Sequence, residues 1–326
     1  MKEIAISRKA ALPPRSAAAP DRTGASLRNP MHGIRHLNRL AERWYAEDQD
    51  YFLRPPVIVN SFPNSGAHLV ARLARAFAGS RDYGSTLKSL PTIPFRERSD
   101  AALDRLIRRI VPGEIVSAHL FFSEAHARRI AARNGVHFFV YRDLRDAAIA
   151  EAQELTCVKF WHRLHPFFAG LGNDADRISA AIQGFGHGRF PYDYPHIAHR
   201  FARYEGWLNR PDVMPIAWED LHSDRFADVV RAMARFYLRR CRTPADEEQI
   251  TAAARRIADE EAAGLLRSMA PGAWACAFTA EHHRRFEKIA GALNRRLGYG
   301  GTEGRAGEAA SSAVVLFGSA RRKAGA

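Results

Sequence analysis

Short runs rich in β-branched and aromatic residues alternate with amphipathic segments along the middle of the chain. This alternation limits the fold more than any other feature of the sequence. The strand-like runs lie at residues 57–62, 114–121, 136–142 and 213–218. Each is followed by a segment whose apolar residues recur at helical spacing. The pattern predicts an α/β fold of three layers, with a central, mostly parallel sheet flanked by helices.

Two further details refine this prediction. Pro215 favours a sheet edge or a strand end for the last run, since proline cannot donate a ladder hydrogen bond. Additional helices are expected at about 36–49, 245–266 and 280–297, and Thr279 is placed to cap the last of them.

The ends of the chain differ in composition from its middle. Residues 1–35 are rich in Pro, Ala, Ser and Arg without helical or strand period, and 301–326 are small, polar and basic. Both segments are predicted to be disordered. Residues 36–300 are predicted to form one α/β domain, a reasonable size for a single core.

Charge and cysteine content narrow the class of protein. The chain has 49 Lys and Arg against 35 Asp and Glu, a formal charge of +14, which suits anionic partners without choosing among them. No recognition motif supports nucleic-acid binding. Neither a membrane span nor a secretory signal is apparent. Three scattered cysteines fit a reducing compartment, so a cytoplasmic location is expected.

The stretch PVIVNSFPNSGAHLVARLARAF at 56–77 runs from an apolar strand through a turn into a helix. In such a turn, the backbone N–H groups at Ser65 and Gly66 can face an anion. The turn lacks the lysine and spacing of the triphosphate loop G-x-x-x-x-G-K-[ST], which argues against a nucleoside triphosphate kinase. An ordinary strand–turn–helix is the alternative.

Two other strand ends have side chains suited to an anion or to proton transfer. Arg142 and Arg145 follow the third run, where ligands bind in open α/β sheets, although Arg145 could instead pair with Asp143 or Asp146. His119 ends the second run and could accept a proton from an attacking hydroxyl, or could be structural.

Two further groups of residues have side chains that could form a site. Arg267 precedes a loop containing Gly272 and Trp274, where an arginine could clamp a phosphate and an indole could face a base; a surface loop anchored by the tryptophan is the alternative. Cys157, His162 and His165 have no standard zinc spacing and no evident fourth ligand, so no metal is predicted.

Taken together, these motifs resemble the sulfotransferases that use 3′-phosphoadenosine 5′-phosphosulfate (PAPS). SFPNSGAHLV resembles the family's 5′-phosphosulfate loop [FY]-P-K-S-G-T-T-W-L, and VYRDLRDAAIA resembles its 3′-phosphate motif. SAHL is similar to K-[TS]-H-L, IAWEDL to Y-E-D-[LM], and RSMAPGAWACAFT to R-K-G-x-x-G-x-W-K-x-x-F-T. The resemblance covers about residues 50–300 and implies a P-loop-like sulfotransferase fold.

The resemblance also implies roles for individual residues. His119 would be the general base that deprotonates a hydroxyl or amine, and Arg142 would bind the 3′-phosphate. Arg267 would close over the nucleotide, near Gly272 and Trp274. The implied 5′-phosphosulfate loop and its neighbours are Pro63, Asn64, Ser65, Gly66, Ala67 and His68.

Several positions depart from the family pattern. The loop lysine is Asn64, the loop threonines are Ala67 and His68, and the serine that assists the 3′-phosphate is Ala150. His68 could replace part of the missing charge, so Asn64 and His68 are candidate catalytic residues beside His119. The lysine before the base is Ser117, and the residues after Arg267 are Ser268 and Met269.

These departures leave two functions open: a PAPS-dependent sulfotransferase, or a weak or inactive binding or regulatory protein on the same fold. Retention of His119 favours the enzyme. The acceptor, a small molecule, glycan or lipid, is not identified. Residues 151–200, rich in aromatic side chains, are expected to form an acceptor-side lid. This segment or the first helix could instead form a homodimer interface.

Overall fold

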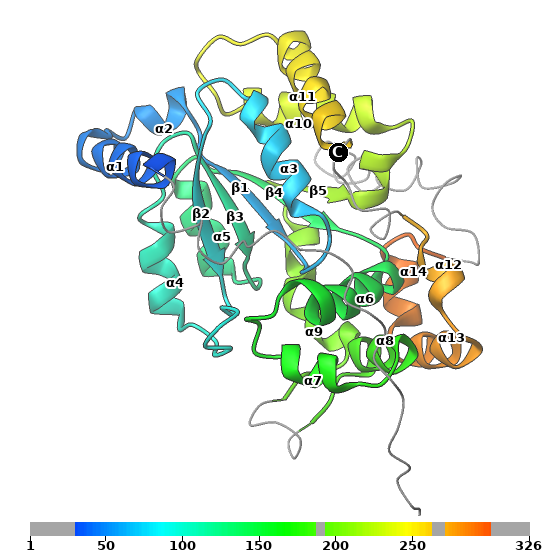
Figure 1. Ribbon diagram of the computed structural model, residues 1–326. Helices are drawn as coiled ribbons and strands as arrows, with labels where there is room; N and C mark the ends of the chain where they lie inside the picture. The colour runs from blue at the N-terminus through cyan, green and yellow to red at the C-terminus, as the bar shows by residue number, and fades with distance from the viewer. Residues whose placement is uncertain (1–29, 187–192, 263–270, 301–326) are drawn as a thin grey trace, which may run out of the picture.

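A five-stranded sheet forms the centre of the protein in the computed structural model, which describes residues 30–186, 193–262 and 271–300 (Figure 1). The strand order is β2-β3-β1-β4-β5, and all four neighbouring pairs are parallel. The parallel α/β fold predicted from the sequence is therefore confirmed. The strands are β1 (Val57–Ser61), β2 (Arg81–Lys88), β3 (Glu114–His119), β4 (Val136–Tyr141) and β5 (Val213–Ala217).

One edge of the sheet is a strand that the sequence pattern did not predict. In β2, only Tyr83 and Leu87 are buried, and Gly84 lies at φ 77° within an irregularity of the pairing with β3. The opposite edge is β5, where Pro215 is paired with Phe139 of β4 on one side only. The placement of Pro215 at an edge is thus confirmed, and an edge strand is where a missing N–H is best tolerated.

Helices cover both faces of this sheet and complete the three predicted layers (Figure 1). The N-terminal helix begins at Pro30, inside the segment predicted to be disordered. Proline is well tolerated in a first helical turn, so Pro30 is compatible with this start. The α-helices are α1 (Pro30–Tyr45), α2 (Asp50–Leu53), α3 (Ala67–Leu73), α4 (Asp100–Ile107), α5 (Glu124–Ala132), α6 (Leu144–Gln153), α7 (His165–Gly170), α8 (Asp174–Gln183), α9 (Ile197–Glu205), α10 (Phe226–Leu238), α11 (Glu247–Ala262), α12 (Trp274–Ala277), α13 (Ala280–Phe286) and α14 (Ala292–Arg296).

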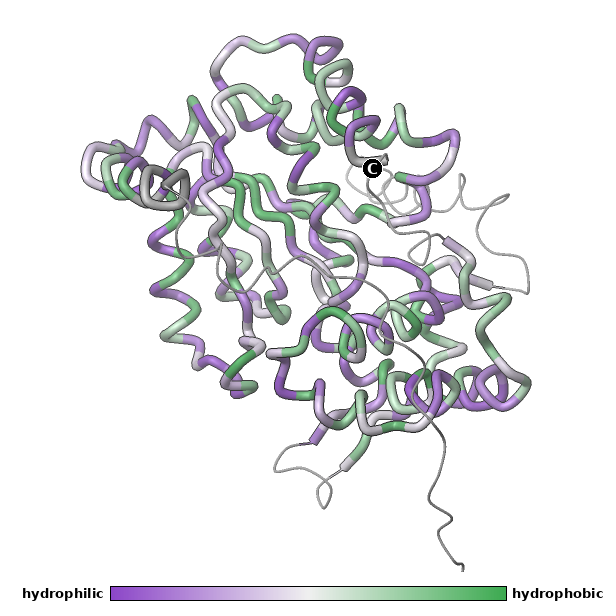
Figure 2. Tube along the Cα trace, viewed as in Figure 1, coloured by the Kyte–Doolittle hydropathy of each residue, from purple (hydrophilic) through white to green (hydrophobic). Residues whose placement is uncertain are grey.

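The central strands β1 and β4 bury side chains on both faces, which explains the mainly apolar character of the middle of the sheet in Figure 2. On β4, Phe138 and Val140 pack with α3, α10 and α11, while Phe139 and Tyr141 point to the opposite core. That second core also takes in α4, α5, α6 and α9. Among the described helices, none is both long enough and apolar enough to cross a membrane.

A buried histidine in β4 makes stability depend on pH. His137 is 2% exposed and packs on Trp207, with ring centroids 4.5 Å apart. Burial lowers the pKa of His137 from 6.5 to about 3, against an opposing effect of Asp212. Because the pKa of His137 is lower in the folded state than in the unfolded state, the unfolded state binds the proton first. His137 therefore leaves the free energy of unfolding undiminished above pH 6.5 and lowers it as the pH falls from 6.5 towards 3.

We therefore expect acid to destabilise the protein and His137→Phe to remove part of that loss. Between pH 7 and 4.5, the variant should lose about 3 kcal/mol less unfolding free energy than wild type. Urea unfolding at the two pH values measures the difference, and parallel losses in both proteins would contradict the prediction. Nε2 of His137 has no hydrogen-bond partner in the described part of the chain, so phenylalanine leaves no new polar group unpaired there.

Candidate active site

The carboxyl ends of the strands meet at one edge of the sheet, where the sequence-predicted residues gather. From β1 the chain crosses towards β2, and from β4 it continues to β5, in the opposite direction. The ends of β1 and β4 therefore border a topological switch point, the usual ligand site of open α/β sheets. Ser61 of β1 is in register with Val140 of β4, so the turn at 62–66 lies beside Arg142.

The turn after β1 holds two residues in left-handed conformations, Asn64 at φ 63° and Gly66 at φ 80°. Ser65, between them, is 1% exposed. Its Oγ has no hydrogen-bond partner among the described residues, which is unusual for a buried hydroxyl. A buried donor of this kind, in a turn before a helix, fits an anion that accepts from it.

The glycine of this turn has a specific packing reason. A Cβ added to Gly66 would lie 2.0 Å from Cε3 of Trp218, which follows β5 and is fully buried. The positive φ adds backbone strain for any other residue. Gly66 thus lets the turn sit directly on the indole, and Trp218 fixes the height of the turn above the sheet.

Arg142 connects the turn to the helix that follows β4. Its Nη1 donates to the carbonyl oxygen of Asn64 at 3.2 Å, and its Nη2 lies 3.6 Å from Oδ2 of Asp146. The guanidinium also lies over the ring of Trp218, 5.8 Å from its centre. Since Arg142 is 1% exposed, it is a buried cation held beside the turn.

Asp146 brings the C-terminal loop to the same place. Its carboxylate accepts from the backbone N–H groups of Gly272, at 2.7 Å, and Trp274, at 2.9 Å. The distant segments 62–66, 142–146 and 271–274 are therefore joined by hydrogen bonds. Arg267 lies outside the described residues.

The second arginine of the motif has a structural role. Arg145 pairs with Asp143 at 2.6 Å and lies 3.5 Å from the centre of the Trp274 ring. This is one of the two pairings that the sequence left open for Arg145. Trp274 is 3% exposed, with Arg145 over its ring, so it anchors the loop in this structure.

The remaining predicted positions supply little charge. Ala67 begins α3, and Ala150 is buried on α6; neither has a hydroxyl. His68 lies 6.3 Å from the ring centre of Trp218. Partial desolvation, together with Arg72 and His222, lowers the pKa of His68 below 6.5. The imidazole is therefore neutral at pH 7 in the free protein, which works against the idea that it replaces the missing lysine.

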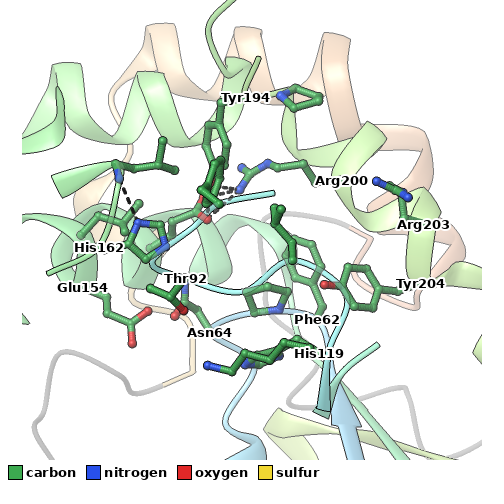
Figure 3. A pocket seen from close by; sticks show the side chains of 18 of the residues that line it. Phe62, Asn64, Thr92, His119, Glu154, His162, Tyr194, Arg200, Arg203 and Tyr204 are labelled. Carbon is green, nitrogen blue, oxygen red and sulfur yellow. Dashed lines mark hydrogen bonds and ion pairs between the residues drawn. The ribbon is translucent and has the colours of Figure 1, made fainter. Parts of the chain in front are cut away.

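His119, at the end of β3, opens into a cavity of about 200 Å³ next to the turn (Figure 3). Its Nδ1 lies 3.1 Å from the Ser61 carbonyl oxygen and 3.2 Å from the Ser61 hydroxyl. A carbonyl can only accept, so Nδ1 carries the proton and Nε2 is left with a free lone pair. Burial lowers the pKa of His119 from 6.5 to about 4, with Lys88 and Lys159 adding to the effect. The ring is thus a neutral acceptor at pH 7.

The cavity is enclosed by the turn, the ends of β2 and β3, and two parts of the segment 151–200. Aromatic rings form much of its wall, including Phe62 and Tyr204, which lie edge to face with ring centres 5.7 Å apart. Figure 3 shows Tyr194, Arg200, Arg203 and Tyr204 on one side, opposite Asn64 and His119. The lining residues from 151–200 are Glu151, Glu154, Leu155, Lys159, His162, Leu164, Asp193, Tyr194, Pro195, His199 and Arg200.

The histidines considered as metal ligands make local hydrogen bonds instead. Nδ1 of His162 accepts from the Leu164 N–H at 3.0 Å, and Nδ1 of His165 lies 2.8 Å from the Leu155 carbonyl oxygen. Cys157 is exposed. Within the described ranges, no group of three or more His, Cys, Asp or Glu is arranged to hold a metal ion.

Lys88 is the main cavity residue that sequence reasoning missed. It ends β2 and is in register with His119 on β3. Its strand was not predicted, so nothing placed it at this edge. The useful signal would have been the spacing of Tyr83 and Leu87. These two residues mark the buried face of a strand, and that strand ends at Lys88.

No family model matches the chain, and no curated protein matches its sequence. Among solved structures, one similar chain is a mouse sulfotransferase, SULT7A1, complexed with PAP. It shares 15% identity over 78% of this chain and 89% of its own length, with a TM-score of 0.49. A likeness this low assigns neither an activity nor a ligand to the chain.

Proposed function

We propose that the protein transfers a sulfuryl group from PAPS to a hydroxyl or amine of an acceptor bound in the cavity. His119 is the general base. Pro63, Asn64, Ser65 and Gly66, with the start of α3 at Ala67 and His68, hold the 5′-phosphosulfate. Arg142 binds the 3′-phosphate, with Arg267, Gly272 and Trp274 closing that side and Ala150 beside it.

The observation that carries this proposal is the position of His119. Its ring is held at Nδ1 by Ser61, at the end of β1, and it opens into the cavity that Asn64 of the turn also lines. The proposed base and the proposed anion-binding turn thus line the same cavity. Separately, Ser65 offers an unpaired buried hydroxyl, and Arg142 offers a buried cation at the switch point.

The chain's residues would act together in one in-line step. The acceptor oxygen or nitrogen attacks the sulfur while its proton passes to Nε2 of His119. The bond from sulfur to the bridging oxygen breaks, and its electrons stay with the leaving adenosine 3′,5′-bisphosphate. Such a transfer depends mainly on positioning and on stabilising charge, which a preorganised cavity provides.

The same geometry suggests how the chain is organised. Residues 151–164 and 193–200 line the cavity on the side away from β1, which suits the acceptor-side lid expected at 151–200. The aromatic wall favours an acceptor that carries a ring or other apolar body next to its nucleophile.

One observation favours the second candidate, a nucleotide-binding protein with little or no turnover. The turn itself has no cation, since position 64 is asparagine and His68 is neutral at pH 7. Such a protein would bind adenosine 3′,5′-bisphosphate and release no product from PAPS.

Ser65→Ala gives a direct test of the nucleotide site. Removing a buried hydroxyl without a partner should leave the free energy of unfolding unchanged or slightly raised. Affinity for adenosine 3′,5′-bisphosphate should fall by about tenfold, as expected for a hydrogen bond to a charged group. Calorimetric titration and urea unfolding of wild type and variant measure both.

The titrations of wild type and Ser65→Ala test the proposed function and the role of Ser65 separately. Absence of binding to wild type at millimolar ligand would reject the proposed function. Equal affinity in both proteins would remove Ser65 from the site. ATP is the comparison ligand, because it lacks the 3′-phosphate assigned to Arg142.

A further inference from the structure

We propose that Lys88 supplies the positive charge that the turn lacks, stabilising the transferring group in the transition state. The inference rests on the proposed function and adds a catalytic residue to it. Lys88 comes from β2, far in the sequence from the turn and outside every motif that the sequence analysis identified.

Three of the four lysine and arginine side chains that line the cavity form ion pairs. Lys159 is paired with Glu154 at 2.7 Å, Arg200 with Glu151 at 2.6 Å, and Arg203 with Glu97 at 2.6 Å. Lys88 is the one lysine or arginine of the lining that has no ion pair with a described residue. Its charge is therefore available to a bound anion, whereas the other three are engaged.

Lys88 also lies on the strand next to the proposed base. Lys88 is in register with His119, and the Ser61 carbonyl on β1 holds the other side of that imidazole. The carboxyl ends of β2, β3 and β1 thus place the lysine, the base and the turn in sequence along one edge. Lys88 and Asn64 both line the cavity. Lys88 also contributes to the low pKa of His119, as expected for a cation near the ring.

A lysine at this position can stabilise negative charge that develops during the transfer. As the sulfur–oxygen bond breaks, negative charge grows on the leaving bridging oxygen. The Asn64 amide can donate a hydrogen bond but adds no net charge. An ammonium on a four-carbon stem can follow the moving group, and its interaction with the developing charge is strongest where water is excluded.

The side chain can be altered without disturbing the sheet edge. Arg98 donates to the Lys88 backbone carbonyl at 2.9 Å, a bond that does not depend on the side chain. Burial lowers the pKa of Lys88, so loss of the ammonium removes a desolvated charge instead of a stabilising ion pair. Lys88→Met should therefore fold as wild type does.

The test compares Lys88→Met, Lys88→Arg and the control Lys288→Met, an exposed lysine that does not line the cavity. Transfer from ³⁵S-labelled PAPS is measured with panels of phenols, aliphatic alcohols and amines, and with water alone as the acceptor. Lys88→Met should lower kcat by about 10²–10³-fold with little change in affinity for adenosine 3′,5′-bisphosphate. Lys88→Arg should retain more activity, and Lys288→Met should stay within about threefold of wild type.

A suppressor variant and a readout that needs no turnover complete the design. In the Lys88→Met background, Asn64→Lys should restore part of kcat by returning the charge to the turn. Titration of the His119 ring by NMR should give a higher pKa in Lys88→Met than in wild type. A kcat for Lys88→Met within about threefold of wild type, or an unchanged pKa of His119, would overturn the inference. If wild type binds no nucleotide, the proposed function itself fails, and a separate binding titration reports that outcome.

Discussion

Replacing His119 by alanine should reduce sulfuryl transfer by about 10²–10⁴-fold while leaving the affinity for adenosine 3′,5′-bisphosphate nearly unchanged. The imidazole lines the cavity proposed to hold the acceptor, and its Nδ1 is engaged with Ser61, so its loss should remove the proposed proton transfer but none of the proposed nucleotide contacts. Steady-state kinetics and calorimetry of the variant measure the two effects. Equal losses of rate and nucleotide affinity would indicate a structural histidine.

The pH dependence makes this prediction sharper. The pKa of His119 in the free protein is about 4, so kcat/KM should fall on the acid side only as the pH approaches 4. An unperturbed histidine base would place that limb near 6.5. The matched control is His162→Gln, since His162 lines the same cavity and its pKa is also lowered to about 4. Its Nδ1 accepts from the Leu164 N–H, so its loss should leave the acid limb in place.

The sequence predicts the centre of the fold well because the central strands are buried on both faces. The runs at 57–62 and 136–142 are mostly apolar, and β1 and β4 lie inside the sheet with neighbours on both sides. Local chemistry is similarly legible at Thr279, where the structure has a reciprocal capping box with His282. The apolar pattern of a strand and the residues of a cap both lie within a few positions of each other, so a single sequence carries the information.

The edge strand β2 was missed because an edge strand needs little apolar sequence. Gly84 and the exposed positions around it resemble a loop, and pairing with β3 alone defines the strand. Lys88 was missed with it. Lys88 lies on a strand with a weak apolar pattern, so it could be identified as a candidate only after the register placed it beside His119.

The candidate site was only partly predictable because its key contacts join distant segments. Local spacing placed Arg142 and Asn64 at strand ends, but not the hydrogen bond between them. It could not show that Asp146 holds the loop at Gly272, or that Arg145 covers Trp274. Pairing partners of buried charges depend on packing, which spacing along one chain does not specify.

Replacing Gly66 by alanine should destabilise the protein by roughly 2–5 kcal/mol, a large change for a single added methyl group. Two effects add at this position. The backbone lies at φ 80°, and the new Cβ would meet ring carbons of Trp218 at 2.0–2.1 Å, inside a core that cannot yield easily.

Gly272→Ala separates the two effects, because Gly272 lies at φ 81° with nothing within 4 Å of the added Cβ. Its unfolding free energy should fall by only about 1–2 kcal/mol, the strain of the backbone alone. Gly172→Ala, with open space and no positive φ, should be close to neutral. Urea unfolding of the three variants gives the comparison, and equal losses for Gly66→Ala and Gly272→Ala would mean that Trp218 moves aside. In that case, the indole would not fix the height of the turn, and Ser65 and Asn64 would keep their places without it. A larger loss at Gly66, together with weaker nucleotide binding in the folded variant, would show that packing on Trp218 positions the turn that the proposed chemistry needs.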